Sequence, residues 1–92
     1  MKYVKVRWIH TSSDQPVMLY SELNDESWEL RKVEVYADGR ADFADREEQS
    51  GSTKLGIEPL PPLEEIAADP EFEPVVISAE EFEAAWESAK AR

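Results

Sequence analysis

The fold is decided by residues 28–45, which read WELRKVEVYADGRADFAD. In this stretch, runs in which apolar and polar residues alternate lie on either side of Asp38-Gly39. An Asp-Gly pair between alternating runs is typical of a β-hairpin, because its two-residue turn requires positive φ angles that these residues tolerate. The stretch therefore predicts two strands, over residues 28–37 and 40–45, joined by a two-residue turn.

The first of these strands carries an irregularity in its alternation. Trp28 and Leu30 share one parity, whereas Val33 and Val35 share the other. A bulge near Arg31-Lys32 would reconcile the two halves, since one extra residue shifts the alternation of side chains by one position. Burial of both faces of the strand is the alternative interpretation.

The residues before this hairpin predict two further strands, over 2–10 and 17–23, because apolar and polar side chains alternate there as well. Residues that favour turns separate the runs. The sequence therefore predicts a four-stranded, mainly antiparallel sheet spanning residues 2–45. One face of its first strand would carry Val4, Val6, Trp8 and His10.

The second half of the chain predicts a loop and a short helix before the C-terminal segment. Residues 46–56 are polar and contain Gly and Ser, which favours a mobile loop. Pro61 and Pro62 lead into a helix over residues 63–69, since proline is tolerated in the first turn of a helix. Pro70 then ends this helix, because the residue before a proline is disfavoured in the helical conformation.

A C-terminal helix over residues 78–90 has the strongest local signals. Ser78 and Glu81 predict a capping box, in which each side chain accepts a hydrogen bond from the other residue's backbone N–H. Ile77 and Phe82 have the spacing of the hydrophobic staple that accompanies such a cap. An apolar stripe at helical spacing, which we expect to pack on the sheet, consists of Phe82, Ala85, Trp86 and Ala89.

Length and composition describe one small domain, residues 1–92, without disulfides. Of the 92 residues, 41% are hydrophobic and none is cysteine. No apolar run approaches the roughly 20 residues that cross a bilayer, and the N-terminal residues lack the apolar core of a signal peptide. We therefore expect a cytoplasmic α+β domain whose four-stranded sheet is covered on one face by helices 63–69 and 78–90.

Acidic residues are concentrated in the second half of the chain. Residues 41–92 contain 14 Asp and Glu against 4 Lys and Arg, whereas residues 1–40 contain 7 against 6, and the formal net charge is −11. This excess disfavours direct binding to nucleic-acid phosphates and to anionic membranes. It favours attraction of a basic partner, and solubility alone is the alternative reason for it.

An acidic face on a small domain predicts a non-enzymatic binding protein that occupies a basic surface of a protein partner, such as a toxin or a nucleic-acid-binding protein. Immunity proteins and inhibitors that mimic nucleic acid act in this way. No Lys or Arg interrupts the acids between residues 64 and 87, so none is neutralised by a neighbour on its own helix. The expected partner-binding face consists of Glu64, Glu65, Asp69, Glu71, Glu73, Glu80, Glu83 and Glu87.

The competing prediction is a small-ligand-binding or enzymatic domain. His10 is the only side chain with an unperturbed pKa near neutral pH, and Ser12, Ser13 and Asp14 follow it closely. Catalysis requires a nucleophile, a base and oxyanion donors in one place, however, and the simpler interpretation is that His10 caps the turn through its ring nitrogens. The aromatic pocket of this alternative would be built from Trp8, His10, Tyr20, Trp28 and Tyr36.

Neither a metal nor a cofactor is expected. One His and no Cys leave only oxygen ligands for a metal, and the clusters of acids lack the spacing of a calcium-binding loop. The three glycines are isolated and form no phosphate-binding loop. Among the cations of the predicted sheet, we expect pairing across strands with the internal acids Glu22, Glu29 and Glu34.

A series of short segments follows a specific order along nearly the whole chain. They are Lys5–His10, Pro16-Val17, Leu19–Glu22, Arg31–Glu34, Asp38-Gly39, Pro61–Ile66, Asp69–Phe72, Ile77-Ser78, Glu81-Phe82 and Trp86. Together they resemble a family of short uncharacterised bacterial proteins that is described only as a domain of unknown function. The resemblance implies a free-standing bacterial domain and brings with it no reaction, cofactor or partner.

Overall fold

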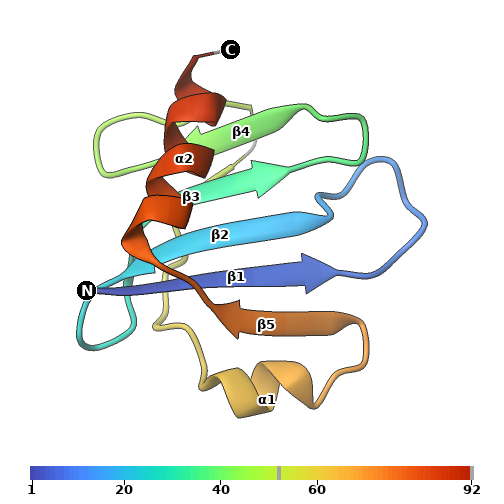
Figure 1. The fold of residues 1–92 in the computed structure, drawn as a ribbon, viewed down its shortest axis with the longest axis vertical. Coiled ribbons are helices and arrows are strands. Elements are labelled where there is room, and N and C mark those ends of the chain that lie inside the picture. Colours follow the sequence, from blue (N-terminus) through green and yellow to red (C-terminus); the bar gives the residue numbers. More distant parts are fainter. Residues whose placement is uncertain (52, 92) are drawn as a thin grey trace.

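The computed structural model describes residues 1–51 and 53–91, so Ser52 of the expected loop and Arg92 lie outside it. Within this part of the chain, five antiparallel strands form one sheet in the order β4-β3-β2-β1-β5, accompanied by two helices (Figure 1). The α+β class is therefore confirmed, with one strand more than expected. The elements are β1 Lys2–Trp8, β2 Met18–Leu23, β3 Glu29–Val35, β4 Ala41–Ala44, α1 Leu63–Ala67, β5 Phe72–Val76 and α2 Ala79–Lys90.

The β3–β4 hairpin forms where Asp38-Gly39 predicted it, but its turn is longer than two residues. Tyr36 N–H donates to the Arg40 carbonyl at 2.8 Å, which leaves three residues in the loop. Gly39 has a φ of 91°, whereas Asp38 is not among the residues with positive φ. A three-residue loop with a left-handed glycine is the next most common way to close a hairpin.

The bulge in β3 lies one residue before the expected position. Glu22 pairs with Arg31 and Leu23 pairs with Glu29, so Leu30 is the extra residue. The bulge brings Glu29 to the same face of the sheet as Lys32, whose Nζ lies 3.7 Å from Glu29 Oε1.

The strand β5 was not expected from the sequence. It pairs with β1 from Val4↔Val76 to Trp8↔Phe72, so β1 lies inside the sheet and not at its edge. Pro74 argues against a strand, but proline is tolerated in an edge strand because its missing N–H deprives no neighbour of a hydrogen bond. The β-branched residues that follow Pro74 were the available signal for extended structure.

The helix α2 packs on one face of the sheet, which we call the α2 face. Ser78 Oγ accepts the Glu81 N–H at 3.1 Å, as expected for the cap. The Glu81 carboxylate, however, binds Lys5 Nζ at 2.7 Å and does not complete a capping box. The apolar stripe is buried as predicted at Phe82, Trp86 and Ala89, whereas Ala85 is half-buried. A buried Phe side chain contributes about 1.5–3 kcal/mol. The buried cluster consists of Val33, Ile77, Phe82, Trp86 and Ala89.

The two helices do not share a face of the sheet, contrary to the prediction. α2 contacts β1, β2, β3 and β4, whereas α1 contacts β5, beside which it lies in Figure 1. Tyr3 of β1 packs against the cluster under α2. Val6, on the other face of β1, lines a cavity together with Ile66 of α1. We call this second face the groove face. α1 is also shorter than predicted, because it ends at Ala67.

The segment between β4 and α1 is bound to the groove face, where a mobile loop was expected. Thr53 is 1% exposed and its hydroxyl donates to the Glu34 carboxylate. Gly56 N–H donates to Glu29 Oε1 at 2.5 Å, and Lys32 Nζ lies within 4.0 Å of both carboxylates. Pairing across strands, as predicted, is found for Glu22, which binds Arg31 of the neighbouring strand. Glu29 and Glu34 instead pair with Lys32 within β3, and these two acids also hold the segment in place.

Candidate protein-binding site

The five residues of the expected aromatic pocket do not surround one cavity. The rings of Trp8 and His10 meet edge to face with their centroids 4.7 Å apart. Tyr20 packs against the core on the α2 face, whereas Trp8 lies on the groove face. Tyr36 is buried beside the β3–β4 turn, and Trp28 is 39% exposed beside the β2–β3 turn. None of these five residues lines any of the cavities described below.

His10 uses both ring nitrogens to hold the turn between β1 and β2. Its Nε2 lies 2.8 Å from the Pro16 carbonyl oxygen, and its Nδ1 accepts the Ser12 N–H at 3.0 Å. A ring that accepts at Nδ1 and donates from Nε2 is the neutral Nε2–H tautomer. The interpretation of His10 as a turn cap is therefore confirmed, and a role as a base would require this turn to break.

The eight acids of the expected partner-binding face fall into separate groups. Glu83 binds Arg31 on the α2 face, and Glu73 Oε1 lies 3.7 Å from Arg7 Nη1. Glu71 accepts a hydrogen bond from Trp8 Nε1 at 3.3 Å. Glu80 and Glu87 are exposed on α2, which packs against β1 to β4, whereas Glu64 and Glu65 are on α1, which packs against β5. The expectation of one continuous acidic face is therefore wrong, because strand cations neutralise part of it and two elements divide the rest.

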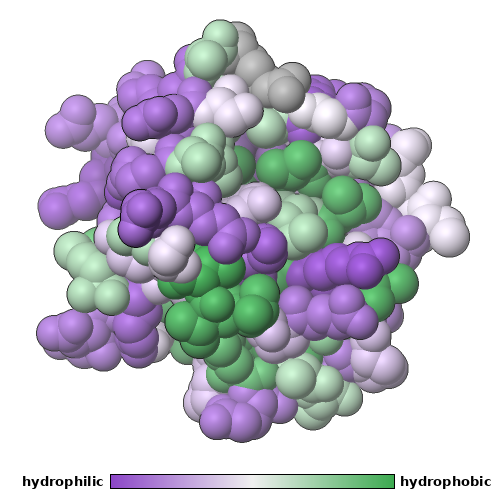
Figure 2. Space-filling view, viewed as in Figure 1, coloured by the Kyte–Doolittle hydropathy of each residue, from purple (hydrophilic) through white to green (hydrophobic). Residues whose placement is uncertain are grey.

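The α2 face illustrates this division (Figure 2). Hydrophilic side chains cover much of α2, and a hydrophobic area is exposed below the helix, over the C-terminal end of β5. Val75, which pairs with Lys5 and lies on this face, is 47% exposed. The charged side chains under α2 mainly bind one another: Glu81, for example, raises the pKa of Lys5 through their hydrogen bond.

Three acids at α1 keep their charge uncompensated. Glu64, Glu65 and Asp69 are exposed, and in the described part of the chain none lies within 4.0 Å of a Lys or Arg nitrogen. We call these three residues the α1 acidic edge. They project from a single short helix and its C-terminal turn, so their charges act together on anything that approaches this side of the molecule.

A cavity of about 430 Å³ lies beside the α1 acidic edge, and we call it the α1 hollow. Glu65 and Asp69 are among the residues that line it, and both are exposed. Its volume is within the range of small-molecule and side-chain binding sites. The remainder of its lining is apolar and comes from β1, β2, β5, α1 and the segment before α1: Val6, Leu19, Leu60, Pro61, Ile66 and Phe72.

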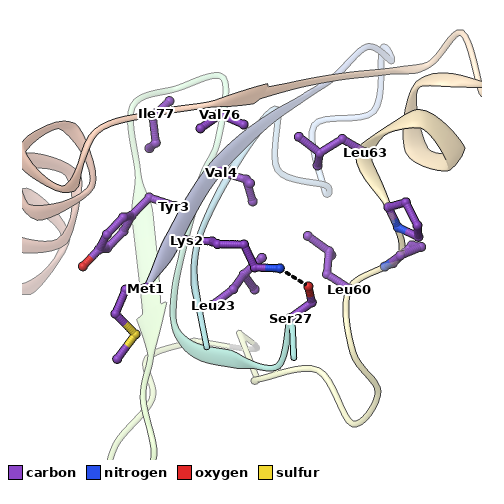
Figure 3. Close-up of a pocket in the computed structure, with 12 residues that line it drawn as sticks. Met1, Lys2, Tyr3, Val4, Leu23, Ser27, Leu60, Leu63, Val76 and Ile77 are labelled. Carbon is purple, nitrogen blue, oxygen red and sulfur yellow. Dashed lines mark hydrogen bonds between the residues drawn. The ribbon is translucent and has the colours of Figure 1, made fainter. Parts of the chain in front are cut away.

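A second cavity, of about 320 Å³, continues the groove face toward the N-terminus. Figure 3 shows Leu60 and Leu63 pointing from the proline-rich segment and α1 toward Val4 at its centre. Lys2 Nζ donates to Ser27 Oγ at 2.7 Å beside this cavity. We call it the N-terminal hollow. Both hollows are lined by Leu60 and Pro61, so they lie on either side of one short segment.

Backbone hydrogen bonds hold α1 and its flanking residues at the sheet. Leu60 N–H donates to the Ser27 carbonyl at 2.7 Å before the helix, and Ile9 N–H donates to the Glu71 carbonyl at 2.7 Å after it. Phe72 lies against Trp8, with ring centroids 5.7 Å apart. The walls of the α1 hollow are therefore fixed from both ends of the segment.

The residues of the α1 hollow were missed by sequence reasoning, although its acids were included in the expected acidic face. Val6 and Leu19 were assigned to strands, and their apolar character is what every strand core shows. Their meeting with Ile66 and Phe72 depends on the pairing of β5 with β1, which no local pattern reveals.

Among the described residues, no three His, Cys, Asp or Glu side chains gather in a way that would hold a metal ion. No helix in this part of the chain has the length and apolar character that crossing a membrane requires. A family model described as Domain of unknown function (DUF6881) matches residues 2–91. No curated protein and no solved structure matches the chain.

Proposed function

The chain belongs to this DUF6881 family of domains of unknown function, and we propose from the charges on its surface that it is a non-enzymatic binding protein. Its α1 acidic edge occupies a basic surface on a protein partner. The observation that carries the proposal is the contrast between the acids of α1, which have no cation within 4.0 Å in the described part of the chain, and those of the α2 face, several of which pair with strand cations.

Charge supports this choice of surface in two ways. The net charge of −11 attracts a cationic partner over a distance of about 10 Å at moderate salt. Binding of the three carboxylates to Lys or Arg of a partner also costs no internal salt bridge, since they form none among the described residues. Binding by the α1 acidic edge thus requires no rearrangement of the fold.

The class of protein that we propose is the immunity protein or inhibitor, with a toxin or a nucleic-acid-binding protein as the basic partner. The proposed setting is the cytoplasm of a bacterium. The alternative, a ligand-binding or enzymatic site around Trp8 and His10, gains no support from the geometry, because both nitrogens of His10 bind the turn.

The test is capture of partners from lysate by the immobilised protein and by two variants of equal charge. One variant carries Glu64→Gln, Glu65→Gln and Asp69→Asn, and so loses the α1 acidic edge. The Asp69→Asn change preserves the local turn, because an amide oxygen still accepts the Glu71 N–H that Asp69 Oδ1 accepts at 2.9 Å. The matched control carries Asp25→Asn, Glu26→Gln and Glu47→Gln, which change acids elsewhere on the molecule.

We expect the wild-type protein and the control to retain the same basic protein at 25 mM salt and to release it at 500 mM salt. The variant without the α1 acidic edge should fail to retain it. Equal capture by both variants, capture that salt does not weaken, or a captured partner without a basic surface would each overturn the proposal.

A further inference from the structure

We infer that the α1 hollow receives one large apolar side chain, Phe or Leu, from a basic segment of the partner. Lys or Arg residues on either side of that side chain bind Glu65 and Asp69. The inference rests on the proposed function and specifies the partner: a cationic segment with an apolar anchor, where charge alone would accept any basic surface.

The lining of the α1 hollow defines the anchor. Val6, Leu19, Ile66 and Phe72 offer no hydrogen-bonding group from their side chains, so a polar group placed among them would lose its bonds to water. An apolar side chain gains free energy there in proportion to the area that it buries. Side chains of this kind, seated in a fixed pocket, commonly supply most of the affinity of a protein interface.

The acids of the hollow define the residues beside the anchor. Glu65, Ile66 and Asp69 all line the hollow and belong to the same short segment of the chain. A cation next to the anchor meets a carboxylate as the anchor enters, whereas an acid in that position meets like charge. The hollow therefore selects an apolar residue flanked by cations.

The N-terminal hollow is also apolar, but the charge at its edge is opposite. Lys2 lines it and donates to Ser27, and no acid is among its lining residues. A cationic segment is attracted to the α1 hollow and repelled from the N-terminal hollow by the nearest charge. Of these two cavities on the groove face, only the α1 hollow combines an apolar lining with acids.

The α1 hollow also needs little ordering before it binds. Hydrogen bonds from Leu60 N–H and Ile9 N–H hold the segment at both ends, and Trp8 supports the ring of Phe72. A site that is already formed avoids the entropic cost of ordering its walls on binding.

The test uses two synthetic peptides, acetyl-Lys-Arg-Lys-Phe-Lys-Arg-Lys-amide and the same peptide with Ala in place of Phe. Calorimetry at 50 mM salt gives both dissociation constants. We expect the Phe peptide to bind at least about tenfold more tightly, the difference that burial of one aromatic side chain supplies. Methyl resonances of Val6, Leu19 and Ile66 should shift with the Phe peptide and much less with the Ala peptide.

A pair of variants locates the anchor. Leu19→Phe adds volume inside the hollow, and Met18→Phe adds it at the neighbouring residue, which lies on the α2 face. Leu19→Phe should abolish the advantage of the Phe peptide, and Met18→Phe should leave it unchanged. In the variant carrying Glu65→Gln and Asp69→Asn, both peptides should weaken by the same factor while the Phe advantage remains.

The outcomes separate the two proposals. Equal binding of both peptides, weakened by salt and by loss of Glu65 and Asp69, would overturn the anchor and leave the charged site standing. Failure of both peptides to bind would overturn the two together. If the protein self-associates in sedimentation equilibrium, and Leu19→Phe abolishes this, the hollow belongs to a second copy of the chain and the inference is wrong.

Discussion

Glu22 and Arg31 face each other across β2 and β3 and are joined by two hydrogen bonds, from Nε to Oε1 at 2.7 Å and from Nη2 to Oε2 at 2.9 Å. Arg31 also binds Glu83 of α2, and its guanidinium lies 4.9 Å from the ring centroid of Phe82 and 5.0 Å from that of Trp86. One guanidinium thus connects two strands to the helix that covers them.

Replacing Arg31 by Lys should destabilise the protein although the charge is kept. A Lys ammonium is a single point charge and cannot reproduce the planar fork that meets both carboxylates. We expect the free energy of unfolding in urea to fall by about 1–3 kcal/mol, the range for lost hydrogen bonds to charged groups. The matched control is Arg46→Lys, at an exposed residue, which should change it by less than about 0.5 kcal/mol. Equal effects of the two substitutions would contradict this role of Arg31.

The Glu22–Arg31 pair should make stability depend on pH in the acid range. Its hydrogen bonds from Arg31 lower the pKa of Glu22 in the folded protein. A carboxyl group whose pKa is lower when folded stabilises the fold above its unfolded pKa, about 4.3, and loses that contribution as pH falls through the folded pKa.

Comparison of the wild-type protein with Glu22→Gln isolates this contribution from the rest of the acidic chain. The difference in melting temperature, followed by circular dichroism, should be constant from pH 8 to about pH 5 and shrink at lower pH. A difference that is as large at pH 3 as at pH 7 would show that the charge of Glu22 contributes nothing.

Loss of the His10 side chain should affect the turn between β1 and β2 and leave partner binding intact. His10→Phe keeps an aromatic ring beside Trp8 but removes both ring hydrogen bonds, so we expect a loss of about 1–2 kcal/mol in the free energy of unfolding. Gln15→Ala, an exposed change in the same turn, is the control. Nitrogen NMR of the wild-type ring should show the Nε2–H tautomer. The Nδ1–H tautomer would contradict the arrangement described.

Removal of the Thr53 hydroxyl should loosen the segment that crosses the groove face. Thr53→Val keeps the shape of the side chain but leaves Glu34 without this donor, at an expected cost of about 1–3 kcal/mol. Hydrogen exchange at the Gly56 amide, which binds Glu29, should become faster. Thr11→Val, at an exposed residue, should change neither quantity. Unchanged exchange in Thr53→Val would mean that the segment is held elsewhere.

Local patterns predicted most of the sheet and the C-terminal helix. The first four strands, the hairpin at Asp38-Gly39 and the cap at Ser78 were all found close to the expected residues. Each depends on residues only a few positions apart, because side-chain alternation, turn chemistry and capping are properties of a short segment. The local signals were wrong in two places: the hairpin turn is one residue longer than predicted, and β5 was not predicted at all because Pro74 disfavours a strand.

The candidate site was predicted only in part. Glu65 and Asp69 were named as partner-binding acids, but the α1 hollow beside them was not expected. The pocket proposed around Trp8 and His10 did not form, since the Trp8 ring packs on both His10 and Phe72. Aromatic residues in a strand pattern serve a core and a pocket equally well, and the sequence does not distinguish the two uses.

Composition and short-range patterning were thus sufficient to establish an acidic α+β domain with a capped C-terminal helix. Which acids keep their charge free was settled by contacts between distant residues: Lys5 binds Glu81 and Arg31 binds Glu83, 76 and 52 positions apart. The same is true of β5, whose pairing with β1 creates the α1 hollow. The physical reason is that a charge or an apolar side chain finds its partner through space. No spacing along the chain records which strand cation an acid will meet once the sheet and its helices have packed.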